Sequence, residues 1–160
     1  MIRIGIDAMG GDFAPEVAIE GAVMSLKLLN KESRIVLYGD EKRIRELIKK
    51  HGASESDFDI VATTQVIEMG DHPAKAFIAK RDSSMTRGFN DLAEGKIDGF
   101  ASAGSTGAIL TGAVLKIGRL KGVSRPALCP ILPTKKGTPV CICDCGANMD
   151  AKPINLCHFA

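Results

Sequence analysis

Strand-like and helix-like segments alternate along most of this chain. Short apolar runs typical of buried strands cover residues 2–6, 34–38, 58–62 and 99–102. Helical patterns follow them at residues 15–29, 40–52, 73–94 (interrupted around 82–84) and 105–120. Strands that alternate with helices need crossover connections, so they lie mostly parallel in one sheet. The pattern predicts a single three-layer α/β domain over residues 1–160.

The pattern changes near the end of the chain. Residues 127–132 and 138–143 are typical of two further strands, and the short loop 133–137 between them suits an antiparallel hairpin. We therefore expect a mixed sheet and a buried strand just before Asp144. A last helix is predicted to start at Pro153, and domains seldom end where an element begins. Residues 1–160 are therefore expected to be an N-terminal portion of a longer protein.

Composition excludes several classes of protein. The net charge of +2 gives no basic footprint of the kind that binds nucleic acid. No apolar run approaches the length that spans a bilayer, and the N-terminus lacks the apolar core of a signal peptide. These features predict a cytoplasmic protein with no nucleic-acid partner.

The five cysteines all fall in the last third of the chain. Their odd number, without a secretory signal, argues against a disulfide framework. No CxxC pair is present, so the spacing does not favour zinc. We expect the cysteines to be small buried side chains, and we predict no metal and no cofactor.

A first candidate site lies between the first strand and the first helix. Gly10 and Gly11 would let backbone N–H groups approach an anion beside the helix N-terminus, with Asp12 next to them. The alternative is a glycine turn followed by an acid at a helix start. Asp7 and Asp12 oppose a bare phosphate unless a basic group or a substrate proton offsets them.

A second candidate site spans the junction between the strand at 99–102 and the next helix. Its hydroxyls and glycines are able to donate hydrogen bonds to phosphate oxygens; they are Ser102, Gly104, Ser105, Thr106 and Gly107. The turn contains no acid, which favours an anionic ligand over the alternative of a hydroxyl helix cap with glycines for close packing.

Two further clusters contain ionisable groups. His72 is a candidate acid or base. The basic residues Lys80 and Arg81, followed by Ser83 and Ser84, are candidates for binding an anionic substrate, although such charge runs are usually solvated. Past the strand that ends near residue 143, a glycine-containing turn carries a group of acids, an amide and a lysine, namely Asp144, Asn148, Asp150 and Lys152. Open α/β sheets build ligand sites at such strand ends.

Three common catalytic motifs are missing. The chain has no GxGxxG fingerprint, no GxxxxGK[ST] loop and no GxSxG nucleophile turn. The remaining residues indicate a phosphate-binding α/β protein that binds and orients its substrates, without a covalent acyl-enzyme.

Taken together, the motifs resemble the phosphate acyltransferases of bacterial phospholipid synthesis, the PlsX family. The matching segments run in the family's order: Asp7–Asp12 with Ala14–Pro15, Glu68–Met69, Lys80 with Ser83–Met85, Ser102–Ala108, Arg125–Ala127 and Asp144–Pro153. Ser105 stands where the family usually carries an asparagine, and family members continue well beyond residue 160.

The resemblance implies transfer of a fatty acyl group from acyl carrier protein to inorganic phosphate. It also implies a fold similar to isopropylmalate dehydrogenase and phosphotransacetylase, a homodimer and loose peripheral membrane association. Phosphate is then the nucleophile, so no catalytic serine or cysteine is needed. Acyl carrier protein is acidic, and a basic docking surface is available in Lys116, Arg119, Lys121 and Arg125.

On this hypothesis, the segment from Gly104 to Gly107 holds phosphate, and Lys152 neutralises it or polarises the thioester carbonyl. Asn148 donates to the oxyanion, and Asp144 or Asp150 orients the lysine. Two alternatives stay open: a phosphotransacetylase-like enzyme that uses acyl-coenzyme A, and a truncated binding domain without turnover. Residues 1–160 alone are expected not to turn over acyl carrier protein substrates.

Overall fold

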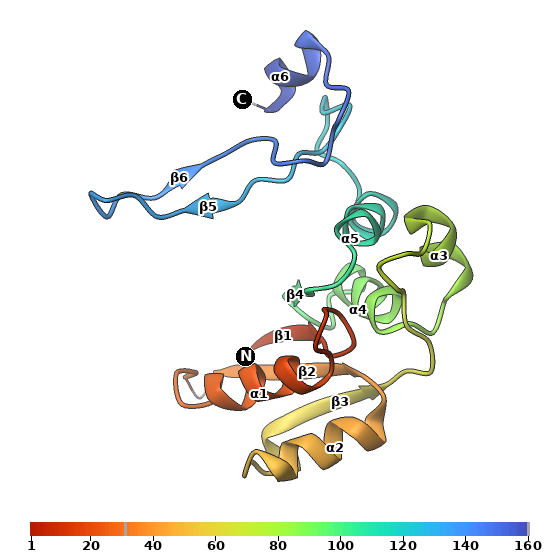
Figure 1. Ribbon diagram of the computed structural model, residues 1–160, viewed down its shortest axis with the longest axis vertical. Helices are drawn as coiled ribbons and strands as arrows, with labels where there is room; N and C mark the ends of the chain where they lie inside the picture. The colour runs from red at the N-terminus through yellow and green to blue at the C-terminus, as the bar shows by residue number, and fades with distance from the viewer. Residues whose placement is uncertain (31, 160) are drawn as a thin grey trace. The chain divides into compact units, whose positions relative to one another are not determined.

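The computed structural model describes residues 1–30 and 32–159. It forms two compact units, Met1–Ile117 and Gly118–Ala160, which we call the sheet unit and the hairpin unit (Figure 1). Within the described residues, no helix combines the length and the apolar character needed to cross a membrane.

The sheet unit is built on four parallel strands. They are β1 (Ile2–Asp7), β2 (Ser33–Gly39), β3 (Phe58–Ala62) and β4 (Gly99–Ala101). Their order is β3-β2-β1-β4, so the chain moves outward from β1 to β3 and then returns to the other side of β1. The parallel sheet expected from the alternating pattern is confirmed. The strand order reverses at β1, and ligands of open α/β sheets bind at this kind of reversal.

Helices connect the strands. Their bounds are α1 (Glu16–Ser25), α2 (Glu41–Lys50), α3 (Pro73–Ala79), α4 (Ser84–Ala93) and α5 (Thr106–Gly112), with a 3₁₀ turn η1 (Glu55–Asp57) and a π-helical segment η2 (Ala113–Ile117). The break expected around residues 82–84 separates α3 from α4. The predicted first helix is shorter than expected and ends at Ser25.

Alternate side chains of β2 pack on opposite faces of the sheet. Leu37 lies in one core with Ile19 of α1 and Ile44 of α2. Tyr38, the next residue, lies in a core on the other side, against which Leu92 of α4 packs. Because successive side chains of a strand point to opposite faces, helices cover both faces. The three-layer prediction is confirmed.

A third core joins α3, α4 and α5. Phe77 and Phe89 meet edge to face with ring centroids 5.9 Å apart, and Phe89 meets Phe100 of β4 at 5.4 Å. A Cβ added at Gly112 would lie 2.5 Å from the Phe89 ring. This close approach holds α5, and therefore the turn that precedes it, against the rest of the sheet unit.

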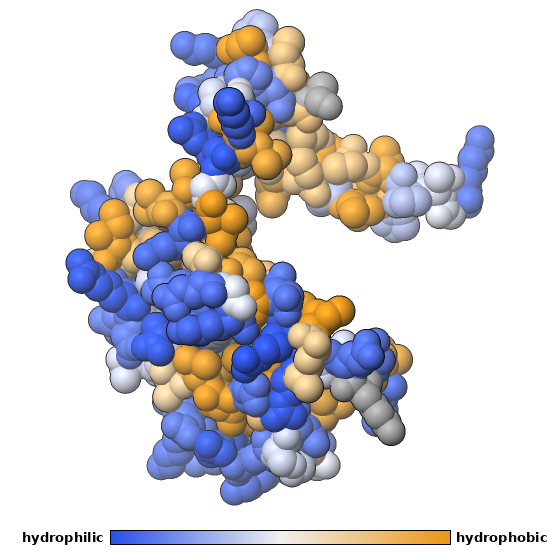
Figure 2. All heavy atoms as spheres, turned by 180° about the vertical axis from the view of Figure 1, so that it is seen from behind, coloured by the Kyte–Doolittle hydropathy of each residue, from blue (hydrophilic) through white to orange (hydrophobic). Residues whose placement is uncertain are grey.

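The hairpin unit contains β5 (Ile131–Leu132), β6 (Val140–Cys141) and α6 (Pro153–Phe159). β5 and β6 pair antiparallel, so the predicted hairpin is confirmed, although it forms a two-stranded sheet of its own. Its apolar side chains are exposed (Figure 2), which makes the expectation of a buried strand at 138–143 wrong. Two short strands paired only with each other bury little apolar surface.

The cysteines are exposed, as the hairpin is. All five are free thiols on the surface, in contrast to the expected buried side chains. Four of them lie in residues 129–145, along the hairpin and just past it, and Cys157 lies on α6. Composition indicated the preference of a thiol for burial, but the hairpin offers no packed layer in which to bury it.

Candidate functional site

Two of the predicted turns meet at the carboxyl edge of the sheet. β1 ends at Asp7 and leads into Gly10, whereas β4 ends at Ala101 and leads into Ser102. The two strands are neighbours, with Ile6 paired to Ala101. The first and second candidate sites are therefore side by side at the point where the strand order reverses.

Asp7 joins the two turns. Its side chain is only 3% exposed, and its Oδ2 accepts a 2.7 Å hydrogen bond from the hydroxyl of Ser102. Its Oδ1 accepts from the backbone N–H of Met9 at 3.0 Å, and the Ser102 oxygen accepts from the N–H of Gly104 at 3.0 Å. Hydrogen bonds to a carboxylate are among the stronger ones in proteins, so this chain of contacts fixes both backbones.

Glycine allows the turns to touch. A Cβ added at Gly10 would lie 2.6 Å from Asp7 Oδ2 and 2.8 Å from the Gly104 nitrogen. Gly11 adopts a φ of +112°, a conformation that side chains disfavour. The close packing of protein on protein is therefore one reason for these glycines, and anion binding stays a prediction.

The start of α5 leaves one hydroxyl toward solvent. Ser105 is buried, and its oxygen caps the helix by accepting from the backbone N–H of Ala108 at 3.4 Å. Thr106 is exposed at the first position of the helix. A Cβ at Gly107 would lie 2.7 Å from Pro73 at the start of α3. Thr106 is thus the hydroxyl of this junction that is placed to meet a ligand.

An apolar hollow of about 380 Å³ adjoins the glycine turn. Its lining includes Gly10, Gly11, Asp12, Phe13, Ala14, Val17, Ala18, Met69 and Ala103. Phe13 and Met69 are 74% and 63% exposed. Large exposed apolar side chains beside a polar turn are typical of a surface that binds something apolar.

The cluster around His72 and Lys80 lies in the loops before α3 and α4. Lys80 donates through its ammonium to Asp71 at 2.6 Å and to the carbonyl of Val66 at 2.8 Å. The hydrogen bond from Lys80 to Asp71 lowers the pKa of Asp71. His72 occupies the N-cap position of α3 without a side-chain capping bond.

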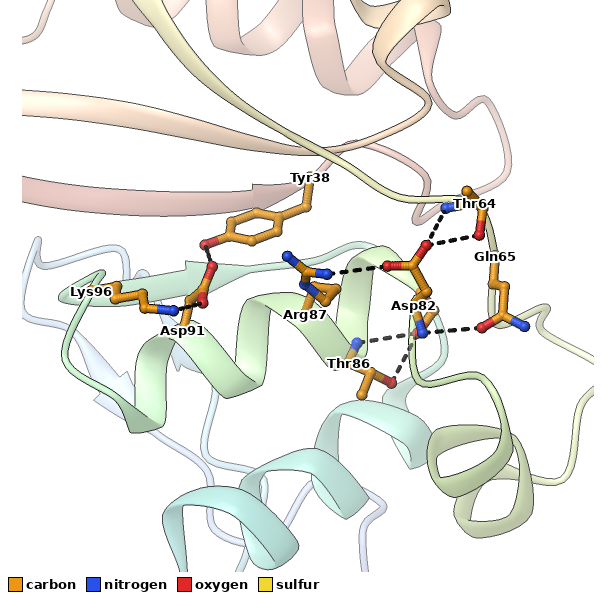
Figure 3. A network of polar contacts seen from close by, with 9 residues as sticks. Tyr38, Thr64, Gln65, Asp82, Thr86, Arg87, Asp91 and Lys96 are labelled. Atoms are coloured by element: carbon orange, nitrogen blue, oxygen red, sulfur yellow. Dashed lines mark hydrogen bonds and ion pairs between the residues drawn. The ribbon is translucent and has the colours of Figure 1, made fainter.

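Asp82 and Ser83 anchor the start of α4. The carboxylate of Asp82 accepts from the backbone and hydroxyl of Thr64 at 3.0 and 2.7 Å, and from Arg87 at 3.3 Å (Figure 3). Ser83 is fully buried and caps the helix by accepting from the backbone of Thr86. These contacts support a structural role for Ser83, which the sequence also makes a candidate for binding an anionic substrate.

In the hairpin unit, Asp144 organises the turn that follows it. Its carboxylate accepts from the backbone N–H groups of Leu128, Ala147 and Asn148 at 2.8, 3.2 and 2.7 Å. Burial acts to raise the pKa of Asp144, but the hydrogen bonds from Leu128 and Asn148 outweigh it and hold the pKa below its ordinary value.

The side chain of Asn148 is held from two sides. Its Nδ2 donates to the carbonyl of Pro126 at 2.9 Å and to Asp144 at 3.0 Å. An amide nitrogen has two N–H groups, and both are used within the protein in this arrangement. Asn148 is thereby placed as a positioning group for the turn.

Asp150 pairs with Arg125 rather than with Lys152, the lysine that Asp144 or Asp150 was expected to orient. The Arg125 Nη1 lies 2.6 Å from Asp150 Oδ1, and this contact raises the pKa of the guanidinium and lowers that of the acid. Lys152 is exposed, and its backbone N–H donates to Asn155 Oδ1 at 2.9 Å. Asp144 thus binds backbone N–H groups and Asp150 binds Arg125. Within the described residues, neither acid is hydrogen-bonded to the ammonium of Lys152.

Two residues of these sites were absent from the predicted set. In the sequence, Asp7 is interpreted as a charge that opposes phosphate, although its place at the end of a buried strand is a usable signal. Arg125 lies in the Arg125–Ala127 motif and is predicted only as part of a docking surface.

Comparison with known proteins covers almost the whole chain. The model of the fatty acid synthesis protein family matches residues 2–160. The phosphate acyltransferase of Caldicellulosiruptor bescii is 46% identical over 159 residues, which are 99% of this chain and 47% of the relative. Those of Thermoanaerobacterium thermosaccharolyticum and Ligilactobacillus salivarius are 45% and 44% identical over 159 and 164 residues, covering 99% and 100% of this chain and 46% and 47% of the relatives.

The chain thus spans about half the length of the curated relatives it matches. The resemblance inferred from the motifs is confirmed by relatives that bear the phosphate acyltransferase name. This chain belongs to the fatty acid synthesis protein family.

Proposed function

We propose that this chain carries the phosphate-binding turns of an enzyme that transfers a fatty acyl group from acyl carrier protein to inorganic phosphate. The product is an acyl phosphate for phospholipid synthesis. The observation that carries the proposal is the pair of turns joined by Asp7 and Ser102, with an apolar hollow next to them. The relatives' names agree with this reaction and do not favour the acyl-coenzyme A alternative.

Phosphate is proposed to lie against the start of α5. Thr106 and the backbone N–H groups at the start of α5 supply donors, since the N–H of Gly104 is taken by Ser102, and the field of the helix start favours an anion. Asp12 is exposed on the facing turn. A phosphate that keeps one proton can donate it in a hydrogen bond to this carboxylate, which offsets the repulsion between two negative groups.

The chemistry requires little from the protein beyond placement. A phosphate oxygen attacks the thioester carbonyl carbon, an oxyanion forms, and the thiolate of acyl carrier protein leaves. Holding both reactants in line can supply roughly 7–11 kcal/mol of the barrier reduction. The hollow lined by Phe13 and Met69 is proposed to receive the start of the alkyl chain.

Lys152 remains our proposal for the cation that neutralises phosphate or polarises the carbonyl. The roles of its neighbours are revised, because Asp150 pairs with Arg125 and Asn148 is bonded to Pro126 and Asp144. Asp144 is proposed to order the turn on which Lys152 stands. A homodimer, docking of acyl carrier protein on basic residues such as Lys116, and peripheral membrane association of a cytoplasmic protein are further proposals from the family resemblance.

The test measures acyl phosphate formed from acyl-acyl carrier protein and phosphate. The chain is assayed alone and joined to the part of the Caldicellulosiruptor bescii relative that it does not match. We expect turnover in the joined protein, little in the 160-residue chain, and loss of phosphate saturation in the joined Gly104→Val/Thr106→Ala variant. A Gly21→Ala variant, inside α1 where an added Cβ meets nothing within 4 Å, is the control. Turnover in the joined protein that is unaffected by the double variant would refute the assignment of the site.

A further inference from the structure

The hairpin places Cys129 opposite Cys143. β5 and β6 run antiparallel, and the backbone N–H of Ile142 donates to the carbonyl of Pro130 at 3.2 Å. Continuing this register by one residue brings the two cysteines level with each other. They form a pair next to a hydrogen-bonded pair, and the side chains of such non-hydrogen-bonded pairs approach most closely.

The two sulfur atoms lie 2.9 Å apart, and both cysteines are free and exposed. A disulfide requires an S–S distance of about 2.03–2.05 Å, so the sulfurs need to close by less than an ångström. Exposure lets a small oxidant reach them. The closeness of the two sulfurs and their exposure therefore favour a bond between them.

We propose that Cys129 and Cys143 are a modification site that a small-molecule disulfide converts to an internal disulfide. The thiolate of one cysteine attacks the small disulfide, forms a mixed disulfide and releases one small thiol. The second cysteine then attacks the sulfur of the first and releases the other. The protein loses two hydrogen atoms, and the small disulfide is reduced to two thiols.

This bond would close the base of the hairpin beside the turn at 144–148. Cys143 directly precedes Asp144, whose carboxylate accepts from the backbone N–H of Leu128, the neighbour of Cys129. The same base is held by the N–H of Cys145, which donates to the carbonyl of Leu128 at 2.9 Å. The crosslink therefore joins backbone segments that already meet, and the inference does not depend on the proposed function.

The reaction has a definite pH dependence. The hydrogen bond with Cys143 raises the pKa of Cys129, so its thiol holds the proton more tightly than an ordinary cysteine. Thiolate is the attacking species, so the crosslink should form faster as the pH rises toward that pKa. Cys141 is the rival partner, because it is close enough to Cys129 to influence the pKa of that thiol.

The experiment treats the 160-residue chain with oxidised glutathione, blocks the remaining thiols and digests with trypsin without reductant. Lys135 and Lys136 lie between the two cysteines in the sequence, so digestion leaves them on separate peptides. We expect mass spectrometry to find the Cys129 peptide joined to the peptide that begins at Gly137, with fragmentation placing the bond at Cys143. Reductant should separate the two.

Single serine variants identify the partner. The crosslink should persist in Cys141→Ser and in the matched control Cys157→Ser, and it should disappear in Cys129→Ser and Cys143→Ser. Crosslinking that survives Cys143→Ser as well as it survives Cys157→Ser would overturn the proposal. So would glutathione adducts at Cys129 and Cys143 that never resolve to an internal bond.

Discussion

Gly10→Ala tests how tightly the turns after β1 and β4 are packed. The added Cβ would lie 2.6 Å from Asp7 Oδ2 and 2.8 Å from both the Gly104 nitrogen and the Ser102 oxygen. These atoms are linked by hydrogen bonds and belong to buried or half-buried residues, so none of them moves freely. Overpacking of this kind typically costs about 1–3 kcal/mol. We expect the free energy of unfolding of the sheet unit to fall by about 2 kcal/mol.

Gly21→Ala is the matched control. Gly21 lies inside α1, and a Cβ there meets nothing within 4 Å, so alanine should stabilise the helix by about 0.5–1 kcal/mol. The chain has one tyrosine and no tryptophan, so fluorescence during urea unfolding reports on the buried Tyr38 of the sheet unit. With a denaturant slope of about 1–3 kcal/mol/M, Gly10→Ala should lower the midpoint by roughly 1 M. A Gly10→Ala midpoint at or above that of the unsubstituted chain would refute the packing argument.

Three further predictions concern other groups. Burial, aided by the hydrogen bond to Asp91, raises the pKa of Tyr38 above its ordinary value of 10.0; the unfolded chain then loses a proton that the folded chain keeps, so stability should fall as the pH rises above about 10. Tyr38→Phe should weaken this fall in pH-dependent unfolding followed by circular dichroism, and an equal fall in both proteins would contradict the assignment. Cys141→Ala should change the free energy of unfolding by less than about 0.5 kcal/mol because the thiol is exposed; a loss above about 1 kcal/mol in urea unfolding would mean that the thiol is buried. Asp144→Asn should speed amide hydrogen exchange at Ala147 and Leu128, whose N–H groups it binds, and unchanged exchange would show that the carboxylate does not order the turn.

The sequence was a good guide to the fold wherever the pattern is local. Period and turn residues placed the four parallel strands and the break between α3 and α4, because both depend on near neighbours in the chain. The position of β4 beside β1 depends on contacts between distant segments, such as Ile6 with Ala101, which periodicity does not encode. The exposed hairpin was missed for a similar reason, because apolar composition does not indicate whether a covering layer is present.

The same distinction applies to the candidate site. Glycine and hydroxyl patterns identified both turns separately, but their contact through Asp7 and Ser102 joins residues 95 positions apart. The hypothesis built on the family resemblance also has an acid orient Lys152, whereas Arg125 approaches Asp150 from another segment of the hairpin unit. The partner of a long charged side chain depends on which residues lie near it in the folded chain. Ion pairs of this kind are therefore seen only in the structure.

Phosphate titration of the isotope-labelled chain tests the central claim most directly. The chemical shifts of the backbone amides are followed as inorganic phosphate is added, with sulfate as a second anion. The account predicts saturable shifts confined to Gly10–Asp12 and to the junction from Ser102 to Gly107, which disappear in Gly104→Val/Thr106→Ala. Saturable shifts elsewhere that leave both turns unchanged would contradict the claim that these turns bind phosphate.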